Sequence, residues 1–122
     1  MRGRSEIPGS APVRPQKGPK APLNPDRMMT VSIILERNSQ QAIAAVEAFA
    51  RQYGLRVTEA NAAKRTVKVS GSAQALGRAF GVTLEAFGEY IGYQGPLTIP
   101  DNLSGIVMAV LGLDTRPIAH RQ

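Results

Sequence analysis

The sequence contains no cysteine and only one histidine, His120, which lies close to the C-terminus. The absence of cysteine excludes disulfide bonds and thiolate metal sites. No His, Asp or Glu residues have the spacing of metal ligands, and His120 has no neighbour that would orient it as a catalytic base. We therefore predict no catalytic residue, no metal site and no cofactor in this chain.

Long apolar runs and aromatic residues are also scarce. No apolar run approaches the ~20 residues that a membrane-spanning helix requires, and the N-terminus lacks the apolar core of a secretory signal peptide. The chain has three Phe and three Tyr. No expected strand carries an aromatic pair of the kind that stacks RNA bases, so a specific nucleic-acid module is not predicted.

Proline is concentrated near the N-terminus, where six of the nine prolines lie between Pro8 and Pro25. Such a segment buries too little apolar surface to offset its chain entropy. We predict an extended or disordered arm at 1–27, a compact domain at 28–113 and a C-terminal linker at 114–122. The arm holds most of the net charge of +6. This charge fits a solvated tail, or contact with an acidic protein, nucleic acid or an anionic membrane.

The pattern after the arm begins with a strand and a helix. Residues 29–35 alternate in the manner of a strand. Asn38 or Ser39 then caps a helix that runs to about Tyr53, where Gly54 supplies a left-handed C-terminal residue.

The remaining elements are expected to be shorter. They are strands at 55–60, 65–70 and 82–87, a short helix between Ser72 and Gly81, a short edge strand at 89–93, and a last helix that begins at Asp101 or Asn102. The last helix is predicted from an apolar stripe at helical spacing. The stripe consists of Leu103, Ile106, Val107, Val110 and Leu111.

The order of elements predicts an α+β fold. It is a ferredoxin-like antiparallel four-stranded sheet with two helices on one face, plus a short C-terminal helix. The first and third strands should be central. The helix-free face is either solvated or a docking surface. Its expected residues are Thr30, Ser32, Ile34, Arg56, Thr58, Thr66, Lys68, Ser70, Thr83 and Glu85.

Six short phrases in register carry a family resemblance. They are VEAFA at 46–50, YGLRV at 53–57, RTVKVSG at 65–71, AFGVTL at 79–84, PLTIP at 96–100 and VLGLDTRP at 110–117. Residues 7–10 and 30–37 add weaker matches upstream. Together they resemble the activation pro-domain of sedolisin and kumamolisin-type serine-carboxyl peptidases. This chain lacks the segment that family members usually carry between the first strand and the long helix.

The resemblance implies a subtilisin-propeptide-like domain and no enzymatic activity of its own. Such a domain acts as an intramolecular chaperone and cleft-blocking inhibitor of a sedolisin-family acid peptidase, and is removed on acid activation. The implied partner is the cognate peptidase domain, in cis or in trans, with no specific nucleic acid and no membrane. The implied location is outside the cell, as part of a secreted proenzyme.

Two contact regions also follow from the resemblance. The sheet face would dock on the peptidase through Thr30, Ser32, Ile34, Arg56, Thr66 and Lys68. The linker would lead into the cleft, with Ile118 to Gln122 near the processing point. The linker residues are Leu113, Asp114, Arg116, Pro117, Ile118, His120 and Arg121.

Two alternatives remain open at this stage. Leu111 and Leu113 could simply pack at the end of the last helix. The whole chain could also be a stand-alone ferredoxin-like regulatory or nucleic-acid-binding domain, because its basic arm permits nonspecific binding to nucleic acid.

Overall fold

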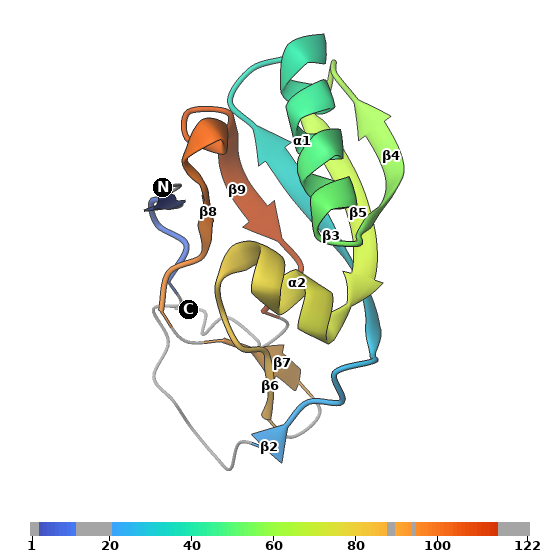
Figure 1. Ribbon diagram of the computed structural model, residues 1–122, viewed down its shortest axis with the longest axis vertical. Coiled ribbons are helices and arrows are strands. Elements are labelled where there is room, and N and C mark those ends of the chain that lie inside the picture. The colour runs from blue at the N-terminus through green and yellow to red at the C-terminus, as the bar shows by residue number, and fades with distance from the viewer. Residues whose placement is uncertain (1–2, 12–20, 88–89, 94, 115–122) are drawn as a thin grey trace, which may run out of the picture.

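The structure, a computed structural model, describes residues 3–11, 21–87, 90–93 and 95–114. Over these residues the chain forms one four-stranded antiparallel sheet, two smaller sheets, two α-helices and a 3-10 turn (Figure 1). The predicted α+β class is therefore confirmed.

The four-stranded sheet has the strand order β4-β5-β3-β9. The strands are β3 (Met28–Leu35), β4 (Arg56–Asn61), β5 (Thr66–Ser72) and β9 (Val107–Leu111), and every neighbouring pair is antiparallel. The first and third strands, β3 and β5, are central as expected. Val31, Ile33 and Leu35 are buried on one face of β3, and Val67 and Val69 are buried on β5.

Two helices cover the buried side of this sheet (Figure 1). Helix α1 (Gln40–Gln52) is capped by Ser39, whose hydroxyl accepts the Ala42 N–H at 3.3 Å. Helix α2 (Ala73–Phe80) is capped by Ser72 and ends at Gly81, which has a left-handed φ of 72°. The rings of Phe49 and Phe80 lie 5.5 Å apart and join the two helices. The sequence predicts both helices and the Ser72 cap correctly, and of its two candidates for the first cap, Asn38 and Ser39, the structure has Ser39.

The expected C-terminal helix is wrong. Residues Asp101–Leu103 form a single 3-10 turn, η1. Ile106 lies in the turn that follows, and Val107, Val110 and Leu111 lie in strand β9. Gly105 and Gly112 flank that strand with φ of 82° and 109°, outside the right-handed helical region. The five residues of β9 include two valines, which favour strands, and pairing with β3 buries Val107.

The expected fourth strand at 82–87 is also wrong as a member of this sheet. Its last residues form β6 (Glu85–Phe87), which pairs with β7 (Tyr90–Gly92) and β2 (Ala21–Pro22) in a separate sheet. The edge beside β3 is occupied by β9 instead. Thr83 and Glu85 therefore do not belong to the helix-free face. The short strand expected at 89–93 corresponds to β7.

The N-terminal segment is extended, as the arm prediction allowed, but it packs on the domain. Strand β1 (Arg4–Glu6) pairs antiparallel with β8 (Thr98–Pro100). The side chain of Ile7 is 2% exposed and belongs to the core. The placement of a domain boundary at residue 28 stays a prediction.

Two glycines give a matched test of the packing between α2 and β8. Gly54 and Gly81 have φ of 73° and 72°, so alanine costs about 1–2 kcal/mol of backbone strain at either position. At Gly81 the added Cβ would also overlap the Thr98 hydroxyl, whereas at Gly54 it meets nothing within 4 Å. We expect Gly81→Ala to lower the free energy of unfolding by about 1–3 kcal/mol more than Gly54→Ala in denaturant titrations. Equal losses would contradict this packing.

Candidate functional site

The helix-free face of the four-stranded sheet gathers the sheet residues singled out from the sequence. Ser32 lies opposite Lys68, and Ile34 lies opposite Thr66, across β3 and β5. Ser70 lies between Thr30 and Arg56 in the next row. Directly opposed residues on antiparallel strands share a face. The fold therefore brings Thr30, Ser32, Ile34, Arg56, Thr66 and Lys68 onto one surface, although their role in binding stays a prediction.

Strand β9 adds apolar residues that the sequence prediction missed. Leu111 lies opposite Ser32 and Ala109 lies opposite Ile34, so both belong to the helix-free face. Leu111 is 57% exposed, and Met28, at the other end of β3, is 67% exposed. Met108 is 39% exposed and lies at the β-bulge in β9. The prediction missed the β9 residues because it assigned this segment to a helix, although the flanking Gly105 and Gly112 were a usable signal. It missed Met28 because the expected strand began at residue 29.

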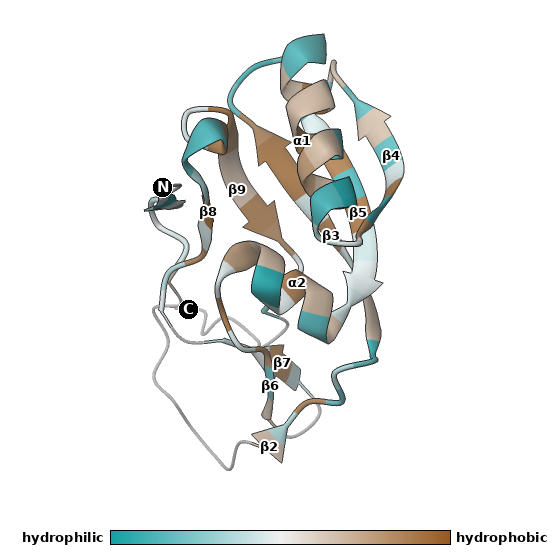
Figure 2. Cartoon of the chain, viewed as in Figure 1, coloured by the Kyte–Doolittle hydropathy of each residue, from teal (hydrophilic) through white to brown (hydrophobic). Residues whose placement is uncertain are grey.

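The face has an apolar half and a polar half. The apolar half combines Ile34 with Ala109 and Leu111, on β3 and β9. The polar half lies on β4 and β5, where Lys68 Nζ and Glu59 Oε1 are 3.9 Å apart. Both of these side chains are about half exposed, so the ion pair adds little stability. Figure 2 shows the same contrast between the hydrophobic β9 and the mixed β4.

The chain leaves the sheet at the apolar half. Gly112 follows β9, and a side chain at this position would meet the Thr30 carbonyl oxygen at 3.2 Å. The next residue, Leu113, is 1% exposed and belongs to the core. The predicted tail therefore begins only after a buried anchor. Asp114 is partly buried, and the remaining predicted linker residues, Arg116, Pro117, Ile118, His120 and Arg121, lie outside the described residues.

The grooves of the domain offer little for catalysis. One groove, with a volume of about 780 Å³, lies between α2, β6 and residues 23–25. Among the described residues that line it, Arg78 and Glu85 are charged and none is a histidine, serine or cysteine. No three His, Cys, Asp or Glu side chains converge on a common metal position in the part of the chain that the structure describes. Within the same residues, neither helix has the length and apolarity to cross a bilayer.

Over the described residues the fold is a small α+β domain with one helix-free sheet face. A family model described as "Pro-kumamolisin, activation domain" matches residues 35–116, and the chain belongs to this family. Kumamolisin from Bacillus sp. (strain MN-32) is 38% identical over 81 residues. The aligned region covers 63% of this chain and 15% of that relative, so the chain spans only a small part of the curated relative's length. The resemblance stated from the sequence is confirmed.

Leu111 and Leu113 provide a test of the anchor. Because Leu113 is buried in the core, we expect Leu113→Ala to lower the free energy of unfolding by about 2–5 kcal/mol. Because Leu111 is about half exposed, we expect Leu111→Ala to lower the free energy of unfolding by no more than about 0.5 kcal/mol. Denaturant titration of both variants measures the difference. A small loss for Leu113→Ala would show that residue 113 belongs to a tail after all.

Proposed function

We propose that this chain is the pro-domain of a sedolisin-type peptidase, and that it docks on the peptidase domain through the helix-free sheet face. In this role it assists folding of the peptidase, blocks the catalytic cleft and is removed in acid. The observation that carries the proposal is the exposed apolar half of the face, which adjoins the point where the C-terminal segment leaves the sheet. We assign the domain to the ferredoxin-like arrangement, with β9 as its fourth strand.

The exposed apolar side chains support docking rather than simple solvation of the face. Isolated exposed apolar residues are common on protein surfaces. Here Leu111 and Ala109 adjoin Ile34 on two neighbouring strands, with Met108 at the bulge beside them. A contiguous apolar patch bordered by polar residues is typical of a protein-interaction site. Lys68 and Arg56, on the polar half, would then set the orientation of the partner.

The buried Leu113 supports the second part of the proposal, the blocking of the cleft. Because Leu113 is fixed in the core, the linker starts from a defined point beside the docking face. An inhibitor that presents its tail from a preordered platform loses less entropy on binding than a free peptide does. Residues 118–122, including His120 and Arg121, would then approach the catalytic groove.

We propose a non-catalytic domain that needs no cofactor and acts outside the cell as part of a proenzyme. A nucleic-acid role is less well supported, because β3, β4, β5 and β9 carry no aromatic residue on which bases could stack.

The docking face can be tested by adding a charge to its apolar half. We expect Leu111→Lys to weaken inhibition of a sedolisin-type peptidase such as kumamolisin by at least about tenfold, because the lysine would be desolvated at the interface. Ala48→Lys is the matched control, since Ala48 is exposed on α1, which packs on the opposite side of the sheet. Inhibition constants and unfolding curves of both variants would be compared. Equal inhibition by the two folded variants would contradict docking through this face.

Release in acid can be tested through the charge of the chain. At neutral pH the net charge of +6 favours an acidic peptidase surface. This attraction should fall as the partner's carboxylates take up protons, so we expect affinity to decrease from neutral pH to pH ~4. Binding is measured by fluorescence anisotropy of a labelled chain with the peptidase kept inactive. An affinity that stayed constant or rose in acid would refute this release mechanism.

A further inference from the structure

Strand β1 occupies a groove that is built mainly from residues far along the chain. Its backbone pairs with β8 in the register Arg4 to Pro100, Ser5 to Ile99 and Glu6 to Thr98. Two further hydrogen bonds extend the ladder at its ends, from Ile7 N–H to the Leu97 carbonyl at 2.8 Å and from Asp101 N–H to the Gly3 carbonyl at 3.1 Å. These main-chain contacts are those of an extended peptide added to a strand edge.

Arg4 makes the most specific contacts of this segment. Its guanidinium donates to the Thr98 hydroxyl at 3.0 Å and the Thr98 carbonyl at 2.9 Å. It also donates to the Tyr53 hydroxyl at 2.9 Å and to the Ala79 carbonyl at 2.5 Å. The acceptors come from β8, from the residue after α1 and from the last turn of α2. Only the planar fork of an arginine can donate to all of them at once.

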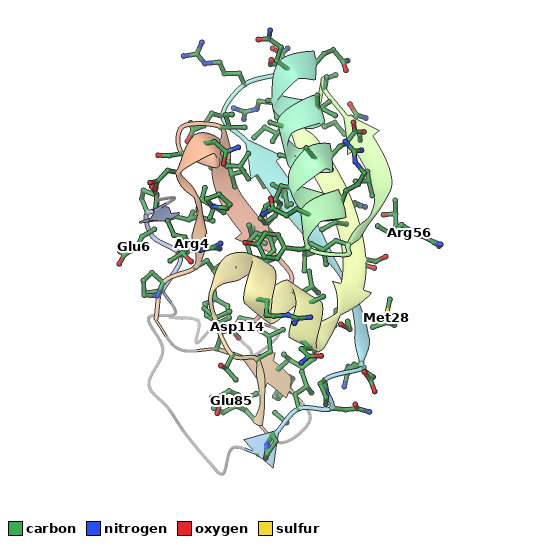
Figure 3. The ribbon with its side chains drawn as sticks, in the orientation of Figure 1. Arg4, Glu6, Met28, Arg56, Glu85 and Asp114 are labelled. Atoms are coloured by element: carbon green, nitrogen blue, oxygen red, sulfur yellow. The ribbon has the colours of Figure 1, made fainter. Side chains whose placement is uncertain are left out.

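The groove is electrostatically suited to this cation. The Ala79 carbonyl lies at the C-terminal end of α2, where the helix dipole favours positive charge. The guanidinium carbon also lies 6.0 Å from the centre of the Tyr53 ring, at the limit of a cation–π contact. In Figure 3 Arg4 points from β1 toward α2, whereas Glu6 points away from the domain.

Ile7 and Ser10 complete the recognition. Ile7 enters the core with 2% of its surface exposed. Ser10 accepts the Leu97 N–H at 2.8 Å through its hydroxyl, and its carbonyl accepts the Tyr93 hydroxyl at 2.7 Å. The groove thus recognises an arginine, an aliphatic residue three positions later and a hydroxyl residue after that.

We propose that β8, the C-terminal end of α2 and Tyr53 form a binding groove for an extended peptide with the pattern Arg-x-x-aliphatic, and that residues 3–10 of this chain are its resident, exchangeable occupant. The groove residues, 53 to 101, lie inside the family match at 35–116, whereas the occupant lies outside it. The contacts of Arg4 bridge up to 94 residues of sequence. The segment is therefore held in the manner of a bound peptide. The proposal does not depend on the docking of a peptidase.

The experiment uses the full chain with a site-specific protease sequence placed between residues 12 and 20, cut after folding. We expect the N-terminal fragment to remain bound to the rest of the chain in native mass spectrometry. A labelled peptide of residues 3–11 should then displace it, as followed by fluorescence anisotropy. All substitutions are placed in the peptide, so the folding of the protein is unaffected.

The peptide variants test the recognition pattern. Arg4→Ala, Arg4→Lys and Ile7→Ala peptides should bind at least tenfold more weakly than the parent, because each loses a specific contact of the groove. The Glu6→Ala peptide is the matched control and should bind within twofold, since Glu6 is exposed.

Four results would overturn the proposal. In the first, the cut fragment dissociates and the labelled parent peptide does not bind in its place. In the second, the cut fragment stays bound and the labelled peptide cannot displace it. Unfolding of the chain on cutting would likewise show that residues 3–10 are a fixed part of the core. Equal weakening by Glu6→Ala and Arg4→Ala would exclude recognition through arginine.

Discussion

The antiparallel pairing of β3 with β9 is the contact on which the other features of this domain depend. It closes the four-stranded sheet, and it places Leu111 and Ala109 on the helix-free face. The same pairing fixes the position of Leu113, so the C-terminal segment leaves the domain beside that face. A helix at 101–111 would have removed these features together.

The two edge strands of the four-stranded sheet, β4 and β9, differ in charge and in regularity. The β4 edge carries charged residues and a bulge near Glu59, both of which discourage pairing with other strands. The β9 edge carries five consecutive apolar residues, Val107–Leu111, and no charge. Edge strands of soluble proteins are usually protected. No strand of the described residues pairs with the outer edge of β9, which fits the proposal that a partner covers this side.

Local signals were sufficient for most of the fold. The alternation at 29–35 and the serine caps and terminal glycines of both helices depend on residues within one or two turns, so the sequence alone predicts them. The stripe from Leu103 to Val110 fits a helix in spacing, but a short apolar run does not distinguish the two structures. Pairing with β3 decides the outcome, and β3 is about 70 residues distant in sequence.

Only the polar half of the helix-free face could be predicted from the sequence, because the apolar half depends on strand pairing between distant segments. The β3, β4 and β5 residues of the face follow from alternation within each strand. The apolar half depends on which strand lies beside β3. Strand β1 was missed because a three-residue strand has almost no sequence signal, and the partners of Arg4 lie 49 to 94 residues away. A proline-rich segment is predicted to be disordered from its composition, because the sequence does not show the strand with which it pairs.

The groove and the proposed docking face share one continuous stretch of chain, from Leu97 to Leu113. Strand β8 forms the groove, and β9, only a short turn further on, forms the apolar half of the face. Strand β8 pairs with β1 and leads directly through η1 to Ile106, the residue before β9. The Ile106 carbonyl accepts the Glu36 N–H. If the occupant of the groove changes affinity at the face, binding at the face must change affinity in the groove by the same factor. The short η1 connection, rather than a chain of distant side chains, is the physical element that would carry such coupling.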